Sequence, residues 1–507
     1  MPIDAKKIVK NTFFLYGRML LIMGVSFYTA RIVLEVLGVN DYGLYFTIFS
    51  IIGLLSFLNG TLSGSTSRFI TFELGSNNAG KLAKTFSTCW IAHILLGLII
   101  IAIGETIGLW YVYKIMVVPP GQLNAAVIVY QFSILITFIS ILQVPFSAEI
   151  IAHEKMNVFA YLGIFEALAK LGIVFILKYG DTNKIILYAI LQSAVSVSLF
   201  FFYLIYSYSK FVEVRFKLQF DKLIFKSILK FSGWNIIANL SNSLMNQGVV
   251  VLLNLFFQPA IVAAQTIANQ LSTAASQFVN NIRQAVNPQI IKLYANSETE
   301  QSQSLTIKSS EYILYLLLLI GVPCIIVMPK LLSIWLAEVP EMGVAFCRLM
   351  IIQVILDNFN AAFYVPMIAA NKISLNSILS CTLCIVQFFM TWLLFHFGLG
   401  PLWARYLGLI TIVILSFIIK PMLLIHDVGF SREKILACVS RSFMILIIIT
   451  SASFLLYISW PQLNIMDSIG IFITSFILVL LLSYLLIGKD DRIKLHQFIS
   501  AKLSKLY

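Results

Sequence analysis

The chain has 507 residues, of which 60% are hydrophobic and only 11% are charged. A soluble globular protein is about half apolar and about a quarter charged, so this composition excludes an ordinary soluble domain. The net charge of +13 would suit a nucleic-acid ligand, but the charges lie in short turns between apolar runs rather than on one soluble face. We therefore expect no nucleic-acid partner.

Apolar runs of about 20 residues, each long enough to cross a bilayer as a helix, recur along the whole chain. Helices are required because backbone polar groups in lipid must be bonded within their own segment, and no run alternates as a barrel strand would. The first run follows three lysines and is too long for a signal peptide, so we expect it to be a retained span. We predict about fourteen spans, at residues 11–36, 42–67, 85–108, 123–147, 158–178, 185–208, 230–256, 260–284, 308–329, 342–369, 374–397, 402–425, 437–459 and 466–487.

The basic residues predict how these spans are oriented. With the N-terminus in the cytoplasm, 26 of the 35 Lys and Arg residues fall in cytoplasmic segments or at the cytoplasmic ends of spans, 4 fall on or next to the opposite side and 5 fall deeper inside spans. A bias of this kind is the positive-inside signal. It predicts an even number of spans, with both termini in the cytoplasm.

A weak internal duplication divides the predicted spans into two groups of six. Shifting the second half by 220 residues aligns the turn LGVNDYGLY with FFQPAIVAA, and VPFSAEIIAHEK and VPMIAANK both close the fourth span of their half. Two six-span halves that begin on the same side are typical of parallel repeats in transporters. We predict two pseudo-symmetric six-helix bundles around a central cavity. The predicted parts are an N-lobe at 1–209, an amphipathic cytoplasmic linker at 210–229, a C-lobe at 230–430, and two further helices with a basic cytoplasmic tail at 431–507.

Polar side chains recur along one face of four predicted spans, although each is expensive to place in lipid. Spacings of three and four residues put each set on a single helix face. The sets are Asn235, Asn239, Asn242 and Asn246; Gln265, Asn269, Ser272, Ser276 and Asn280; Ser56, Asn59, Ser63 and Ser67; and Gln353, Asp357, Asn360 and Tyr364. Interhelical hydrogen bonding explains any one of these residues. The four polar stripes together favour a hydrated cavity, whose amides suit hydroxyl-rich ligands such as sugars.

Acidic residues within the predicted spans allow two interpretations. Arg31 with Glu35, and Lys170 with Glu166, are opposite charges four residues apart on one helix, where they can neutralise each other. Alternatively, Glu35 and Glu166 take part in ion coupling. Asp357 is the main candidate for coupling to protons or sodium, and it can equally pair with an arginine.

Three arginines, Arg18, Arg68 and Arg283, lie near the cytoplasmic ends of their predicted helices. Each alone can extend to the membrane interface. Together they would form an entrance that attracts anions, because a guanidinium binds phosphate through two parallel hydrogen bonds.

Three short motifs relate the chain to a known family: ARIVLEVLGVNDYGLYFTIFSIIGLLSF across the first two spans, SRFITFELG after them, and GPLWARYLG at the twelfth span. Through these motifs the chain resembles the polysaccharide flippases of the O-antigen type, within the MATE-like superfamily of multidrug, oligosaccharidyl-lipid and polysaccharide exporters. The resemblance implies alternating-access translocation of an undecaprenyl-diphosphate-linked oligosaccharide, an O-antigen or capsular or exopolysaccharide repeat unit, across the bacterial cytoplasmic (inner) membrane. The residues expected to bind its charge are Arg18, Arg31, Arg68 and Arg283, and those expected to line the sugar path are Asn235, Asn239, Asn242, Gln265 and Asn269.

The resemblance also implies partners: the lipid-diphosphate-linked sugar, membrane lipids, and a polysaccharide polymerase and glycosyltransferases. We expect a monomer with no cofactor and no metal. A peptidoglycan-precursor flippase stays open, because its lipid carrier is the same. A MATE-type exporter of small cations fits less well, because its cavity should be acidic. A membrane-embedded polysaccharide enzyme fits least, because the largest outward loop, residues 109–122, contains no His, Asp or Glu.

Overall fold

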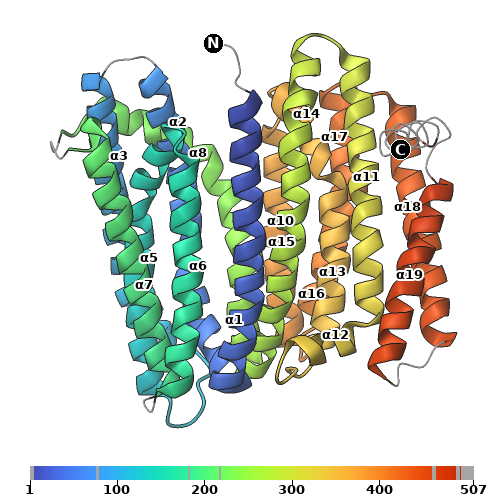
Figure 1. Cartoon of the computed structure of the whole chain (residues 1–507), viewed down its shortest axis with the longest axis horizontal. Helices are drawn as coiled ribbons and strands as arrows, with labels where there is room; N and C mark the ends of the chain where they lie inside the picture. Colours follow the sequence, from blue (N-terminus) through green and yellow to red (C-terminus); the bar gives the residue numbers. More distant parts are fainter. Residues whose placement is uncertain are drawn as a thin grey trace. The chain divides into compact units, whose positions relative to one another are not determined.

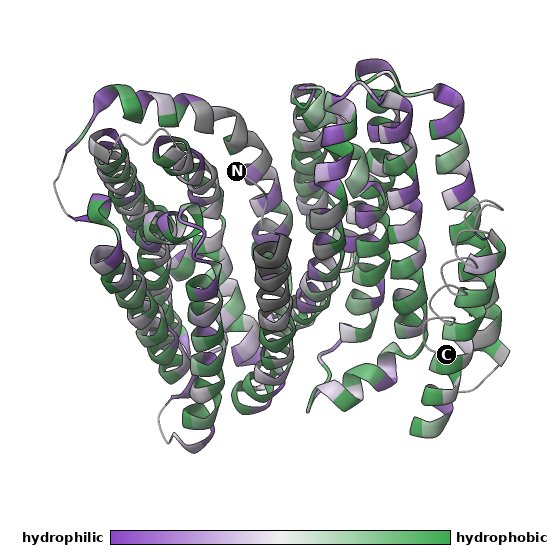
Figure 2. Ribbon diagram, turned by 45° about the horizontal axis from the view of Figure 1, so that its top comes forward, coloured by the Kyte–Doolittle hydropathy of each residue, from purple (hydrophilic) through white to green (hydrophobic). Residues whose placement is uncertain are grey.

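The computed structural model describes the chain apart from residues 1–4, 76–78, 181–182, 216–218, 460–463, 487–491 and 493–507. Throughout these described residues the chain is helical, and they contain no strand (Figure 1). Eleven of the described helices are long and apolar enough to cross a membrane. Hydrophobic residues run along most helices, and hydrophilic residues are frequent at helix ends and in turns (Figure 2). The prediction of an all-helical polytopic membrane protein is confirmed.

The helices follow the predicted spans closely in most of the chain. Those up to residue 256 are α1 (Ala5–Gly53), α2 (Ser56–Gly75), α3 (Ala79–Ile103), η1 (Gly104–Gly108), α4 (Leu109–Lys114), α5 (Leu123–Ala152), α6 (Met156–Tyr179), α7 (Lys184–Lys210), η2 (Val212–Val214), α8 (Lys222–Ser243), η3 (Leu244–Gly248) and α9 (Val249–Phe256). The later ones are α10 (Pro259–Ala295), α11 (Thr299–Ile326), α12 (Met328–Trp335), α13 (Gly343–Phe359), η4 (Asn360–Phe363), α14 (Tyr364–Ala369), α15 (Ser374–His396), α16 (Trp403–Val413), η5 (Ile414–Ile419), α17 (Lys420–Asp427), α18 (Arg432–Ser459) and α19 (Ile465–Leu486).

Three of these helices, α2, α8 and α10, are not among the eleven apolar ones. Each carries one of the polar stripes predicted from the sequence, and the polar side chains lower its average hydropathy. The total of fourteen spans therefore stays a prediction. Among the long described helices, α2, α8 and α10 are the most costly to surround entirely with lipid, because their polar side chains make them the least apolar.

Several helices are interrupted where the backbone changes direction or widens. At Gly38 the backbone has φ 76° and ψ 165°, which separates the first two predicted spans within α1. Glycine is suited to this conformation because it has no Cβ to clash. The second predicted span is broken again at Leu54 and Leu55, between α1 and α2. Short π-helical turns, η1, η3 and η5, widen three further helices.

The helices gather into two compact units. Unit 1 consists of Met1–Ile267, Trp335–Gly343 and Ser377–Ala404, and unit 2 consists of Ala268–Ile334, Val344–Asn376 and Arg405–Tyr507. In unit 1, α5 lies along α3 and α7, α1 lies along α6, and α2 lies along α8. In unit 2, α11 packs against α18 and α19. The lobe boundaries predicted from the sequence stay a prediction.

Large apolar side chains are exposed along the outer helices. On α6 they include Phe165, Leu168 and Phe175, and on α15 they include Phe389 and Trp392. A soluble monomer rarely exposes such continuous apolar surface. These faces are suited to contact with lipid tails, which agrees with a multi-pass membrane protein.

Candidate functional site

A row of polar contacts joins α2 to α8 in unit 1. The Oγ atoms of Ser56 and Ser243 are 3.1 Å apart, and the Nδ2 of Asn239 donates to the Oγ1 of Thr61 at 3.2 Å. We call these four residues the polar seam. Hydrogen bonds of this kind hold transmembrane helices together where apolar side chains would gain nothing over lipid.

Two glycines lie next to amide side chains near the seam. A Cβ on Gly60 of α2 would lie 3.2 Å from the Oδ1 of Asn239, and a Cβ on Gly53, the last residue of α1, would lie 3.2 Å from the Cδ of Gln247 in η3. The glycines therefore give the two amide side chains the room they occupy. Part of the polar stripe predicted on α8 therefore packs against α2, and Asn239 belongs to this packed part.

The other predicted stripe residues differ in their surroundings. Asn242 is exposed on α8, and its Oδ1 accepts a hydrogen bond from the Nδ2 of Asn246 at 2.5 Å. On α10, Gln265 is fully buried in unit 1. Asn269, one turn later, is half-buried in unit 2, and its carbonyl oxygen accepts from Thr273 at 2.9 Å.

The stripe predicted on the tenth span faces basic residues of α16 and α17. The Nη1 of Arg405, which belongs to the GPLWARYLG motif and is buried, donates to the Oε1 of Gln353 at 3.1 Å. The Nζ of Lys420 donates to the Oδ1 of Asn360 at 2.7 Å. Two of the four predicted stripe residues are therefore hydrogen-bonded to cations inside unit 2.

Two further charges, Arg283 of α10 and Asp357 of α13, complete this group. Asp357 interacts electrostatically with both Arg283 and Lys420. The Nη1 of Arg283 donates to the Oδ1 of Asn280 at 3.2 Å. We call Arg283, Asp357, Asn360 and Lys420 the charged cluster, which holds two basic groups and one acid.

Two hydrogen-bond donors of the charged cluster are unused. Among the described residues, the Nε of Arg283 and the Nδ2 of Asn360 are buried and have no hydrogen-bond partner. A buried donor without a partner is costly, and native proteins rarely keep one without a reason. With a net positive charge beside them, these donors are suited to oxygen atoms of an anion.

The remaining predicted charges have separate surroundings within their own units. Arg68 is exposed, with its guanidinium 6.0 Å from the ring centre of Phe69, and Arg31 is half-buried on α1. Both belong to unit 1, whereas Arg283 belongs to unit 2. The side chains of Arg18 and Asn235 lie outside the described residues. A shared anion site for the four arginines therefore stays a proposal.

Two acid–base pairs are predicted within single helices. The Nζ of Lys170 lies 2.7 Å from the Oε1 of Glu166, so this pair forms as expected from its spacing. Glu35 is exposed and Arg31 is half-buried on α1, and their pairing stays a prediction.

Sequence reasoning did not single out Lys420, Arg405 or the group Glu149, His153 and Glu213. The last three are the ligand-type side chains that converge in the described part of the chain, at the end of α5. Lys420 lies near the cytoplasmic end of a predicted span, where a lysine is expected from the positive-inside pattern alone. Its closeness in space to the polar stripe on the tenth span depends on how the helices pack, and periodicity within one helix does not reveal this.

The fold and the site define a class, which is a multi-pass helical membrane protein with polar and charged groups inside its helical units. A family model described as "Polysaccharide biosynthesis protein" matches residues 8–294, which is more than half of the chain. The chain belongs to this polysaccharide biosynthesis family. A search of curated proteins finds no match.

Solved structures with the same fold are transporters and a flippase. A multidrug-resistance MATE family transporter in its inward-facing conformation aligns with a TM-score of 0.63 and 17% identity, covering 78% of this chain and 94% of that one. Lipid II flippase MurJ, in an inward closed conformation, aligns with a TM-score of 0.61 and 14% identity, covering 93% and 98%. A MOP superfamily transporter from Pyrococcus furiosus aligns with a TM-score of 0.56 and 16% identity, covering 85% and 96%. The chain thus shares its fold with these transporters and this flippase.

Proposed function

We propose that this protein translocates a lipid-diphosphate-linked oligosaccharide, the repeat unit of a surface polysaccharide, across the bacterial cytoplasmic membrane. The family description supplies the connection to polysaccharide biosynthesis. The fold supplies a transport mechanism, because it is shared with transporters and with a flippase of a lipid-linked substrate. In this proposal the two predicted lobes alternate between inward-open and outward-open states, and both termini are cytoplasmic.

The observation that carries the proposal is the charged cluster of unit 2. Arg283 and Lys420 give it two positive charges against the one negative charge of Asp357. The unpartnered donors, Arg283 Nε and Asn360 Nδ2, match the acceptor oxygens of a diphosphate. We propose that the diphosphate of the substrate contacts these groups during translocation.

The exposed amides of unit 1 are suited to sugar hydroxyls. Asn242 is exposed on α8 and Asn246 is exposed on the π-helical turn η3, and both offer donors and acceptors. Sugar hydroxyls can replace the hydrogen bonds that these amides make to each other. The polar seam beside them contributes mainly to helix packing.

Two other cargoes can be compared with this arrangement of charges. A small cationic drug would be repelled by Arg283 and Lys420, which argues against cation export. A peptidoglycan precursor carries the same lipid diphosphate and would meet the same charges, so the two lipid-linked cargoes must be compared directly.

The test follows a fluorescent lipid-diphosphate-oligosaccharide across proteoliposome membranes containing the full-length protein. Arg283→Gln and Lys420→Met should each slow its translocation by about tenfold or more, because a hydrogen bond to a charged group contributes about 1.5–3 kcal/mol. Lys434→Gln is the matched control, since Lys434 is a half-exposed lysine of unit 2 whose ion pair with Glu300 spans 3.8 Å. Lipid II serves as the competing cargo.

Wild-type rates in monodisperse Arg283→Gln and Lys420→Met proteins would contradict the role of the charged cluster. Faster movement of lipid II than of the oligosaccharide would replace the proposed cargo while keeping the site. Asp357→Asn separates ion coupling from binding: we expect it to remove any dependence of the rate on a proton or sodium gradient.

A further inference from the structure

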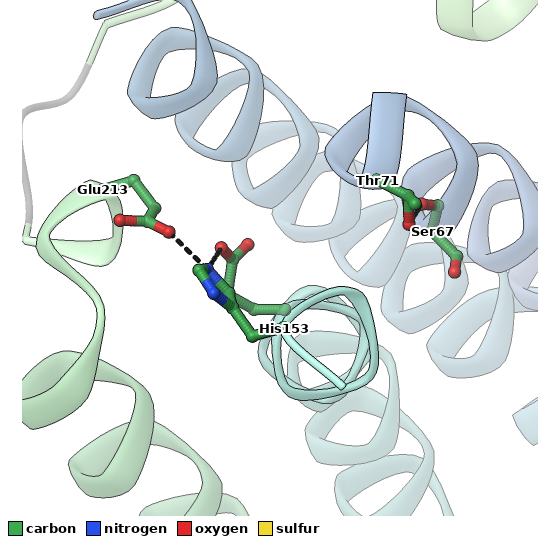
Figure 3. A network of polar contacts seen from close by, with 5 residues as sticks. Ser67, Thr71, His153 and Glu213 are labelled. Atoms are coloured by element: carbon green, nitrogen blue, oxygen red, sulfur yellow. Dashed lines mark hydrogen bonds and ion pairs between the residues drawn. The ribbon is translucent and has the colours of Figure 1, made fainter. Parts of the chain in front are cut away.

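Three side chains of metal-ligating types converge at the end of α5 in unit 1. Glu149 lies in the last turn of α5, His153 follows that helix, and Glu213 lies in the short helix η2 after α7. One ligand atom from each of the three lies within 4.8 Å of the others. The Nε2 of His153 is 2.7 Å from the Oε1 of Glu213 and 3.3 Å from the Oε1 of Glu149. Figure 3 shows His153 and Glu213 pointing toward each other.

Glu149 is the unusual member of this group. Its side chain is fully buried, between Ala148 and Ile150, which belong to an apolar core cluster. Neither of its carboxylate oxygens has a hydrogen-bond partner among the described residues. Because a buried carboxylate is very costly unless its charge is compensated, this position requires a positive charge or a proton.

The other two ligands are held in place before any ion binds. The ring of His153 stacks on Phe211, with ring centres 4.2 Å apart and an interplanar angle of 13°. Phe211 and Val214, on either side of Glu213, are both buried in the same apolar core cluster as Ala148. Glu213 is therefore fixed by its neighbours, and the imidazole is fixed by its stacking partner.

The charge balance favours a divalent cation at this position. Within the described residues, His153 is the ion-pair partner of both carboxylates. One imidazolium between two carboxylates leaves a net negative charge beside an apolar core. A divalent cation bound by all three side chains would compensate the charge of both carboxylates beside the apolar core.

We propose that Glu149, His153 and Glu213 bind a divalent transition-metal ion of the zinc type. Two carboxylate oxygens and one imidazole nitrogen are ligands that zinc accepts, with water completing a four-coordinate site. The spacing of Glu149 and His153, four residues apart at a helix end, places both ligands on one face. His153 is one-quarter exposed, so an ion can enter from solvent. The inference goes beyond the transport function and does not depend on which cargo is carried.

The bound ion would attach the segment after α7 to the end of α5. This segment already docks on α3 further along, where the backbone N–H of Gln219 donates to Ser87 at 3.0 Å and that of Asp221 donates to Thr88 at 3.1 Å. Between these contacts and Glu213 lies the exposed Arg215. Metal binding would restrain residues 211–215, which follow α7.

The direct test measures binding of Zn²⁺ to the chelator-treated full-length protein in detergent, purified with a tag that contains no histidine. We expect one equivalent of Zn²⁺ per chain at pH 7.5. His153→Ala and Glu213→Gln should weaken this binding by about tenfold or more. Glu154→Gln, an exposed carboxylate next to His153, is the matched control and should keep one equivalent.

A second readout follows the linker itself. Zn²⁺ should slow trypsin cleavage after Arg215 in the wild-type and Glu154→Gln proteins, but not in His153→Ala. Glu149→Gln tests the buried ligand, and its melting temperature without metal shows whether it folds. Equal Zn²⁺ binding by wild-type and His153→Ala proteins, or none by the wild type, would overturn the proposal. No binding together with a more stable Glu149→Gln would show that a proton neutralises the carboxylate instead.

Discussion

Gly43 of α1 lies directly against the backbone of Pro259, the first residue of α10. A Cβ on residue 43 would be only 1.9 Å from the Pro259 carbonyl oxygen. These residues belong to the two turns, LGVNDYGLY and FFQPAIVAA, that the internal duplication places in register. The two equivalent turns therefore touch in unit 1. The contact is between backbone atoms, because glycine at position 43 has no side chain.

Replacing Gly43 by Ala should destabilise the protein, because the new methyl group meets backbone and the two helices must separate to admit it. We expect a loss of about 1–3 kcal/mol, typical of overpacking. The measurement is the melting temperature of the purified protein in detergent. Gly64→Ala is the control, because a Cβ at Gly64 meets nothing within 4 Å, and it should be neutral or slightly stabilising.

The side chain of Asn254 holds an extended loop by two hydrogen bonds. Its Oδ1 accepts from the backbone N–H of Val117, and its Nδ2 donates to the carbonyl of Val117, both at 3.2 Å. Asn254→Leu keeps the volume but leaves both backbone groups without this partner. We expect a cost of about 1–3 kcal/mol, with faster hydrogen exchange at residues 116–121. Asn124→Leu, at an exposed asparagine, should change neither quantity.

Tyr130 and Gly108 should show strong coupling in a double-mutant cycle. The Tyr130 hydroxyl donates to the carbonyl of Gly104 at 2.7 Å, inside the π-helical turn η1. A Cβ on Gly108 would lie 2.0 Å from that hydroxyl oxygen. Gly108→Ala alone should therefore be destabilising, and Tyr130→Phe, which removes the oxygen, should recover much of the loss. Additive melting-temperature changes would contradict this account.

Asn239 and Asn242 should differ, although the sequence places both on one stripe. Asn239 is hydrogen-bonded to Thr61 within the polar seam. Asn239→Leu should therefore lower the melting temperature, through a loss of about 0.6–2 kcal/mol in the free energy of unfolding. Asn242 is exposed, so Asn242→Leu should leave stability unchanged and slow translocation of the lipid-linked sugar. The opposite pattern would show that the seam faces the cargo and that Asn242 does not.

Much of this fold could be predicted from apolar run length alone. The predicted span at 342–369, for example, corresponds to α13, η4 and α14. The break at Gly38 lies in the turn predicted between the first two spans. The break at Leu54–Leu55 was not predicted, because an apolar run does not reveal where its backbone bends. The polar helices α2, α8 and α10 could be predicted from the spacing of their polar residues and not from their hydropathy. This spacing is visible in the sequence because the roughly 3.6-residue period of a helix is a local property.

The candidate site could be predicted only in part, because it depends on contacts between helices. Asp357 and Arg283 were identified one at a time, as charges within spans. Their neighbour Lys420 lies 60 residues from Asn360, to which it is bonded. Glu213 is likewise 60 residues from His153. The four-residue spacing of Glu149 and His153 indicates two ligand-type side chains on one helix face. Glu213 could not be predicted as the third member, because its position depends on how the segment after α7 packs.

The polar seam also has a consequence for how the chain is made. Its hydrogen bonds join residues 187 and 178 positions apart, so α2 is synthesised well before α8 exists. At about 5–20 residues per second, α2 waits roughly 10–40 s for its partner. During that interval its serine, threonine and asparagine groups must be satisfied by water or by the insertion machinery. Membrane insertion of α2 should therefore be completed only after α8 emerges from the ribosome, so that truncated nascent chains lacking α8 would leave α2 incompletely embedded.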